Sequence, residues 1–262
     1  MDPFLMIIMI VLGLVGSFFS GLLGIGGAII NYPLLLYVPS LLGAAQFNAH
    51  EVSSISMFQV FFASLAGVLA FRKKSTTGPS FVNKRLVLYM GTSILAGSLI
   101  GGFVSGLLEG GIINLIYGIL AVLAVILMLI PNNGTEENRA ELQFNALIAS
   151  ISAFIVGIVS GIVGAGGAFI LIPVMLTLLH IPARTTIASS LAIVFISAIG
   201  GVVGKITGGA IPLWPTLFTV IGSLIGAPLG SKISAKMNVK VLRYALIILI
   251  SLTSVKIWSS IL

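Results

Sequence analysis

The stretch SGLLGIGGAIINYP at residues 20–33 returns as SGIVGAGGAFILIP at residues 160–173. A shift of 140 positions pairs eight identical residues of the two stretches, including four glycines in each. The glycines remove side chains and permit left-handed backbone, so each stretch is predicted to break a helix. The paired residues of the first copy are Ser20, Gly21, Gly24, Gly26, Gly27, Ala28, Ile30 and Pro33.

A shorter echo supports duplication of a larger unit. The sequence GSLIG occurs at 97–101 and again at 222–226, in the same order relative to the broken stretches. Small residues at this spacing within full-length apolar segments favour close helix packing. We predict a first repeat at 1–131 and a second at 142–262, joined by a polar linker at 132–141. Such duplication is typical of secondary transporters.

The composition places the chain in a lipid bilayer. Of its 262 residues, 58% are apolar and only 7% charged, and the mean hydropathy is +1.22. Soluble domains carry about 25% charged residues. Backbone groups facing lipid must be paired, so the apolar blocks are predicted to be helices of an all-α polytopic membrane protein. The eight blocks cover residues 4–42, 52–71, 86–108, 112–130, 142–179, 186–204, 213–230 and 241–261.

Several function classes fit this composition poorly. Cysteine is absent, which excludes thiolate catalysis and cysteine metal sites. The two histidines and six acidic residues are scattered, so we predict no metal site and no cofactor. The net charge of +7 lies in short loops rather than in a basic patch, which argues against nucleic acid as a partner. No strand precedes the glycines, as a dinucleotide fingerprint would require.

The basic residues favour one membrane topology. If each overlong block crosses the membrane once, the 13 lysines and arginines divide eight against five. If each block instead enters and leaves on the same face, they divide 11 against two, with Lys205 and Lys256 opposite. The positive-inside rule prefers the second arrangement. The two repeats are then inverted relative to each other, and both termini lie outside; each break is either a re-entrant hairpin or two short spans.

The breaks are the predicted substrate site. An unwound backbone inside a membrane is tolerated only where protein or a wet cavity surrounds it. Short helices beginning near Ala28 and Ala168 would direct N–H groups and a positive dipole end at the breaks, which suits an anion. Close packing alone is the competing interpretation. The predicted binding residues are Ser20, Gly24, Gly26, Gly27, Ala28 and Asn31 with Ser160, Gly164, Gly166, Gly167 and Ala168.

Ionisable residues near segment ends are candidates for gating. His50 and Glu51 form a possible proton-handling pair, since histidine titrates near neutral pH. Arg184 and Lys205 are candidates for attracting an anion. The alternative is that these side chains merely extend towards water from the ends of the segments.

Polar side chains near the starts of two segments have a simpler interpretation. Gln59 lies within its apolar block and is expected to face protein rather than lipid. The serine pairs that open the second and sixth blocks are either part of the site or N-terminal helix caps. They are Ser53, Ser54, Ser189 and Ser190.

The two glycine-rich stretches, with the central linker and GSLIGAPLGSKIS at 222–234, resemble the sulfite exporter TauE/SafE family, also called TSUP. The resemblance covers nearly the whole chain. It implies a carrier of small sulfur-containing anions, such as sulfite, thiosulfate or organosulfonates, in a prokaryotic plasma membrane. Asn31 and Tyr32 depart from the small or aliphatic residues usual there, which bears on the first-repeat side of the site.

We therefore expect an alternating-access anion transporter that binds its substrate between the two breaks. Gly26→Leu and Gly166→Leu are expected to abolish binding without preventing membrane insertion. A passive anion channel is the alternative, and an intramembrane enzyme fits less well because no nucleophile is paired with a base. The sequence leaves the anion, the direction, the coupling ion and the oligomeric state open.

Overall fold

The computed structural model describes most of the chain as helices. Within that part of the chain there is no β-strand, and the predicted linker at 132–141 lies outside it. Gly24, Gly26 and Gly27 of the first break also lie outside it. The described residues are 2–23, 28–74, 82–129, 144–208, 211–234, 244, 248, 251–252, 255 and 258–259.

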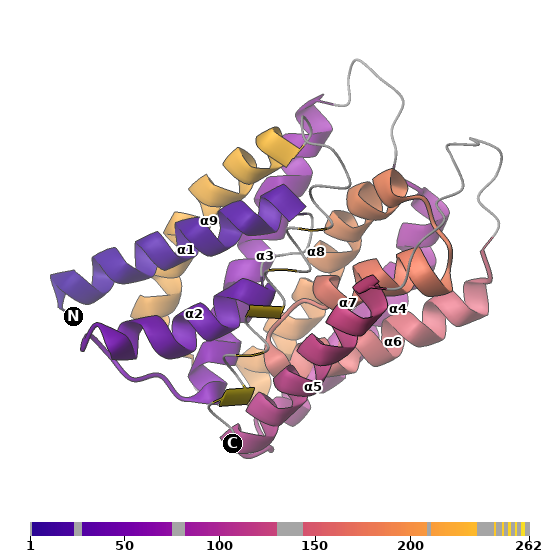
Figure 1. The fold of residues 1–262 in the computed structure, drawn as a ribbon. Coiled ribbons are helices and arrows are strands. Elements are labelled where there is room, and N and C mark those ends of the chain that lie inside the picture. The colour runs from indigo at the N-terminus through magenta and orange to yellow at the C-terminus, as the bar shows by residue number, and fades with distance from the viewer. Residues whose placement is uncertain are drawn as a thin grey trace.

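The helices follow the first seven predicted apolar blocks (Figure 1), and most of the eighth, at 241–261, lies outside the described residues. In the first half they are α1 (Pro3–Leu23), α2 (Ala28–Leu41), α3 (Ala49–Lys74), α4 (Lys84–Ser105) and α5 (Gly110–Leu129). In the second half they are α6 (Ala146–Val163), α7 (Ala168–Pro173), the π-helix η2 (Val174–Leu178), α8 (Ala183–Gly208) and α9 (Leu213–Ser234).

Six of the described helices are long and apolar enough to cross a membrane, and α5 adds a shorter apolar helix. About 20 apolar residues are needed to cross the hydrocarbon core. Many large apolar side chains on the outward faces are exposed, as a lipid environment requires; examples are Leu88, Ile119 and Ile151. The predicted polytopic all-α membrane fold is therefore confirmed.

Asparagines begin three of these helices. The backbone N–H of Glu51 donates to Asn48 Oδ1 at 2.9 Å, and the Asn48 N–H donates to Glu51 Oε2 at 2.9 Å. This reciprocal capping box starts α3. Asn83 and Asn145 accept from the first turns of α4 and α6 in the same way.

The serine pairs are not caps, so that interpretation is wrong. The helices α3 and α8 begin at Ala49 and Ala183, which places the pairs at least four residues inside. The apolar blocks begin later than the helices because the capping turns contain polar residues that hydropathy does not count. Two of these serines instead join segments: Ser53 Oγ donates to the Ile162 carbonyl oxygen at 2.8 Å, and Ser189 Oγ accepts from the Asn83 N–H at 3.1 Å.

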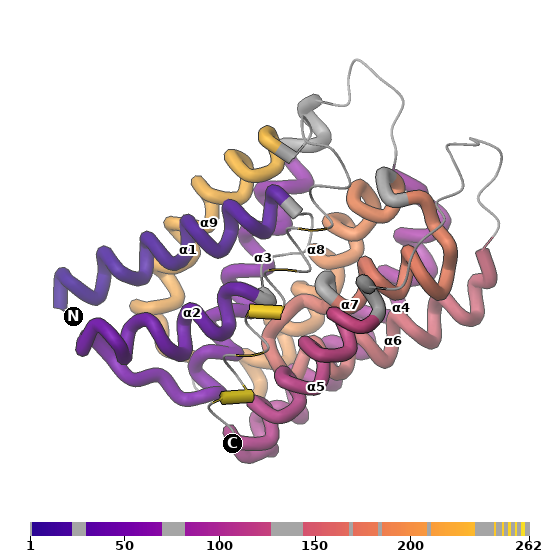
Figure 2. The backbone as a smooth tube through the Cα atoms, in the orientation of Figure 1, coloured from indigo at the N-terminus to yellow at the C-terminus, as the bar shows by residue number. Residues whose placement is uncertain are grey.

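Each glycine-rich stretch joins two helices that run back on each other. From the labelled N-terminus, α1 crosses the molecule and α2 returns, so that both outer ends lie on the same side (Figure 2). The helix α6 begins on the opposite side of the view, and α7 with η2 follows its break (Figure 1). The short helices begin at Ala28 and Ala168, as predicted.

The two halves of the chain exchange partners. The helix α1 packs along α9, and α6 packs along α4, so the first helix of each half lies against the third long helix of the other. The helices α3 and α8 contact each other between these pairs. Corresponding helices thus have corresponding partners, which is the contact pattern of a duplicated unit.

Glycines make the exchanged contacts close. A Cβ added at Gly101 in α4 would collide with the carbonyl oxygen of Ile158 in α6. One added at Gly226 in α9 would collide with the carbonyl oxygen of Leu14 in α1. The GSLIG echo is thus a helix-packing surface, as its spacing predicts.

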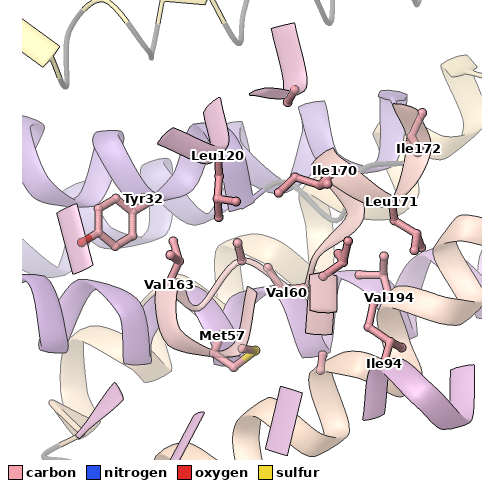
Figure 3. Packing of buried hydrophobic residues seen from close by; sticks show 14 of the residues in the cluster. Tyr32, Met57, Val60, Ile94, Leu120, Val163, Ile170, Leu171, Ile172 and Val194 are labelled. Carbon is pink, nitrogen blue, oxygen red and sulfur yellow. The ribbon is translucent and has the colours of Figure 1, made fainter. Parts of the chain in front are cut away.

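An aromatic contact joins α2 to α5. Tyr32 is fully buried, its hydroxyl donates to Asn114 Oδ1 at 2.7 Å, and its ring stacks on Tyr117 with centroids 4.7 Å apart. Figure 3 shows Tyr32 within the buried apolar cluster. Tyr32 therefore holds α2 against α5.

Candidate functional site

The second break is held in an unusual backbone conformation. Gly164, Gly166 and Gly167 have φ angles of +78°, +61° and +79°. These values belong to the left-handed region that side chains other than glycine disfavour. A Cβ at Gly164 would also collide with the carbonyl oxygen of Ser53 in α3. Both the conformation and the close approach to α3 explain why glycine stands here.

Part of the second break offers unpaired backbone donors. The N–H groups of Gly164 and Ala165 both donate to the Ser160 carbonyl oxygen at 2.9 Å, which ends α6. Among the described residues, the N–H groups of Gly166 and Gly167 have no backbone acceptor. The first N–H groups of α7 likewise have no partner within that helix. Of the backbone N–H groups predicted to bind the anion at 164–168, those of residues 166–168 are therefore the remaining candidates.

Apolar side chains surround this second break. A Cβ added at Gly166 would lie 2.5 Å from Val60 Cγ1 of α3 and 3.3 Å from Val194 Cγ1 of α8. Figure 3 shows Val60, Val194 and Ile170 among the buried residues of this region. The break thus lies inside the protein, with both α3 and α8 against it.

Lys205 lies buried at the end of α6. Its side chain is 1% exposed, although Lys205 belongs to the last turn of α8. Its Nζ donates to Ser53 Oγ, to Ser105 Oγ and, at 3.1 Å, to the carbonyl oxygen of Ile162. Ser53 Oγ in turn donates to the same carbonyl at 2.8 Å. The interpretation that Lys205 merely extends towards water is therefore wrong.

This lysine joins both halves of the chain without a carboxylate. Its partners come from α3, α4 and α6, and no acidic residue pairs with it in the part of the chain that the structure describes. Lysine is almost never fully buried without a charged partner. The last carbonyl groups of a helix carry a partial negative charge. At the end of α6 this charge stabilises the ammonium group of Lys205 but does not neutralise it.

Several polar side chains of the helices around the first break are buried. Ser20 and Asn31 are each 1% exposed, and their side chains have no hydrogen-bond partner among the described residues. Gln59 of α3 is fully buried, as expected from its place within an apolar segment. Ser160, the counterpart of Ser20, donates to the Gly157 carbonyl oxygen of its own helix at 3.0 Å.

The helices that follow the two breaks are in contact. The helix α2, which follows the first break, contacts α7, which follows the second. The helix α3 packs against α1, α2 and α6. Ser53 and Val60 of α3 meet the second break, whereas Gln59 meets α1 before the first. One helix therefore borders both halves of the predicted site.

Among the described residues, the remaining gating candidates form no hydrogen bond with Lys205 or with the second break. The carboxylate of Glu51 accepts from the Asn48 N–H in the capping box of α3, so it stabilises the start of that helix. His50 lies beside it, half-buried, at the same helix end. The side chain of Arg184 lies outside the described residues. Within the described residues there is no group of three or more side chains that could hold a metal ion.

The sequence did not reveal the partners of Lys205. No pattern in the sequence marks Ser105, and the position of Ser53 indicates only a helix cap or a site residue. Both are serines in apolar segments, where a hydroxyl usually bonds its own helix. Gln59 carried a clearer signal, because a carboxamide within an apolar block must face protein.

These features define a polytopic membrane protein with buried polar groups beside two broken helices. The chain belongs to the sulfite exporter TauE/SafE family, whose model matches residues 9–257. It is therefore a membrane transporter, and the family resemblance read from the glycine-rich stretches is confirmed.

Curated relatives carry names of the same kind. The chain is 26% identical over 234 residues to the "Probable membrane transporter protein YunE" of Bacillus subtilis, covering 83% of this chain and 84% of that protein. It is 25% identical over 206 residues to the "Probable membrane transporter protein MJ0441" of Methanocaldococcus jannaschii, covering 78% and 72%. No solved structure matches the chain.

Proposed function

We propose that the protein is a secondary transporter of small sulfur-containing anions, such as sulfite, thiosulfate or an organosulfonate. The observation that carries this proposal is the buried Lys205, which has no carboxylate partner among the described residues. An ionisable residue inside a membrane protein is costly and usually serves function. An anion bound nearby would offset the positive charge.

The position of Lys205 connects that charge to the break. Its Nζ donates to the carbonyl oxygen of Ile162, two residues before Gly164. All three N–H donors of the ammonium have acceptors in this structure. Lys205 therefore acts on the anion through its field. The N–H groups of Gly166 and Gly167, which have no backbone acceptor among the described residues, donate to the anion directly.

The sulfur-containing substrate class rests on the family. The family takes its name from sulfite export. An oxyanion of sulfur has several acceptor oxygens for backbone donors, and such donors recognise anions without a basic side chain in contact. A prokaryotic plasma membrane is the location that the relatives from Bacillus and Methanocaldococcus support.

The exchanged helix pairs support an inverted arrangement of the two repeats. Because α1 and α2 form a returning pair, the first block enters and leaves on one side, as the loop charges favour. Each repeat then crosses the membrane an odd number of times, and both termini lie outside. Movement of one repeat against the other around a shared site would give alternating access.

Transport in liposomes tests this function. The purified protein is reconstituted, and uptake of ³⁵S-labelled sulfite is measured against external concentration, with and without unlabelled sulfite inside. A carrier gives saturable uptake that internal substrate accelerates. Flux that rises linearly and shows no such acceleration would instead support the passive anion channel. Absence of flux for sulfite, thiosulfate and organosulfonates alike would contradict the proposal.

A further inference from the structure

Four buried polar side chains of α1, α2 and α3 have atoms without a hydrogen-bond partner among the described residues. All four residues are at most 1% exposed. Nearby serines behave differently; for example, Ser64 donates to the Phe61 carbonyl oxygen of its own helix at 3.0 Å. Buried polar groups are rarely left unpaired. The atoms are Ser20 Oγ, Asn31 Oδ1 and Nδ2, Ser56 Oγ and Gln59 Oε1.

The orientation of the Gln59 amide is fixed by its partners. Its Nε2 donates to the Gly13 carbonyl oxygen and to Ser17 Oγ, both at 3.2 Å. A backbone carbonyl can only accept, so the amide nitrogen must face α1. The Oε1 atom is therefore an acceptor directed elsewhere, and it needs a donor.

Asn31 lies beside this amide. A Cβ added at Gly16 in α1 would collide with Asn31 Oδ1, and it would lie 3.2 Å from Gln59 Nε2. The missing side chain at Gly16 thus makes the space that the Asn31 carboxamide occupies. The two amides come from α2 and α3, and both lie close to Gly16 of α1.

The second repeat shows that the architecture does not require these amides. The 140-residue shift pairs Asn31 with Leu171, which is fully buried. The 136-residue shift that pairs Ser53 with Ser189 places Gln59 on Phe195, whose ring stacks on Phe61 at 5.4 Å. The corresponding helices therefore form with apolar residues at both positions, and the amides serve another purpose.

We infer that Asn31 and Gln59 bind a hydrogen-bond donor on the transported anion, so that the substrate carries a hydroxyl, an amino group or an acid proton besides its charged oxygens. This inference rests on the proposed function. A carbonyl oxygen such as Gln59 Oε1 repels a bare oxyanion but accepts from a donor. Asn31 and Gln59 of the first repeat thus bind the hydrogen-bond donor of the substrate, whereas Lys205 and the second break bind its negatively charged group.

A matched pair of sulfonates tests the inference. Isethionate (2-hydroxyethanesulfonate) and ethanesulfonate differ by one hydroxyl, and their dissociation constants are measured on the purified protein, together with that of sulfite. We expect isethionate to bind about tenfold more tightly or better, since ethanesulfonate leaves buried acceptors unpaired. Gln59→Met and Asn31→Leu should each weaken the binding of isethionate but not that of ethanesulfonate. The ratio of the two dissociation constants should therefore approach one.

The control is Ser64→Ala in α3, which removes a hydroxyl that bonds only its own helix. It should keep the full preference for isethionate. Asn31→Leu copies the residue of the second repeat, so it decides the test if Gln59→Met does not fold. Gly16→Ala gives a further route, because a Cβ there displaces the Asn31 amide.

The outcomes separate the two proposals. Equal affinity of the wild-type protein for both sulfonates, unchanged in the variants, would overturn the role of Asn31 and Gln59 while leaving anion transport intact. A preference that persists in both variants would likewise overturn it. If the wild-type protein binds neither sulfonate nor sulfite, the proposed function fails and the inference fails with it.

Discussion

At the scale of single residues, the molecule combines glycines that no other residue can replace with polar groups whose roles depend on distant segments. Gly164, Gly166 and Gly167 have left-handed backbone, and their neighbours in α3 and α8 are within contact distance. Lys205, by contrast, donates a hydrogen bond to Ser53, which lies 152 residues earlier in the chain. The glycines are read directly from sequence, whereas the burial of the lysine is not.

Gly166→Ala should destabilise the folded protein and weaken anion binding. The positive φ angle of +61° costs a side-chain-bearing residue roughly 1–2 kcal/mol, and the new Cβ would press on Val60. We expect a lower melting temperature and a larger sulfite dissociation constant. Gly43→Ala is the control for strain alone, because it has φ +65° but open space around it. Equal effects on binding from both changes would contradict a role for the second break.

Sequence reasoning found the break residues because glycine at repeated spacing is a local signal. It placed the end of the sixth block at Gly204, since Lys205 is charged. The helix α8 instead continues to Gly208 with the lysine buried. Only the tertiary contacts with α3, α4 and α6 make that possible, and no local pattern reports them.

At the scale of helices, close glycine contacts hold the exchanged pairs together. The pairs α1 with α9 and α4 with α6 approach so closely that backbone faces backbone at Gly226 and Gly101. Lipid supplies no hydrophobic drive between helices, so such van der Waals contact is a main source of their association. The spacing of GSLIG predicted packing but did not say which helix would be the partner.

Gly101→Ala should separate α4 from α6 and destabilise the protein. The added methyl group would collide with the Ile158 carbonyl oxygen, which cannot move without shifting α6. We expect a cost of about 1–3 kcal/mol, seen as a lower melting temperature in detergent. In α5, Gly111→Ala adds a methyl group where no atom lies within 4 Å. It should be neutral or slightly stabilising, and an equal loss in both variants would contradict the packing interpretation.

At the scale of the whole molecule, the first helix of each half packs against the third long helix of the other half. The inverted arrangement that we propose would account for the exchanged partners and for the loop charges together. Of the two basic residues that stood opposite the other 11, Lys205 is buried and bonded, so it is not a loop charge. The remaining exception is Lys256, which lies outside the described residues.

Membrane topology provides a test at this scale. Alkaline phosphatase, which is active only outside the cytoplasm, should be active when fused at either terminus. The same reporter inserted between residues 75 and 81 should be inactive, because that loop carries basic residues on the opposite side. Activity of the inserted reporter, or inactive fusions at both termini, would contradict two inverted repeats.

In the function that we propose, a small sulfur-containing anion binds beside the buried charge of Lys205. At about 8 Å and an effective dielectric constant of about 20, one unit charge contributes roughly 2 kcal/mol to an anion's binding. Lys205→Met removes that charge and nearly keeps the side-chain length. Lys232→Met is the control, because Lys232 is exposed in the last turn of α9.

The direct measurement is the shift in melting temperature that sulfite causes, followed by tryptophan fluorescence in each purified protein. Ligand that binds only the folded state raises its stability. We predict a concentration-dependent rise for the wild-type protein and for Lys232→Met. Lys205→Met should need roughly 30-fold more sulfite for the same rise. A rise in Lys205→Met equal to that of the wild-type protein would contradict the account.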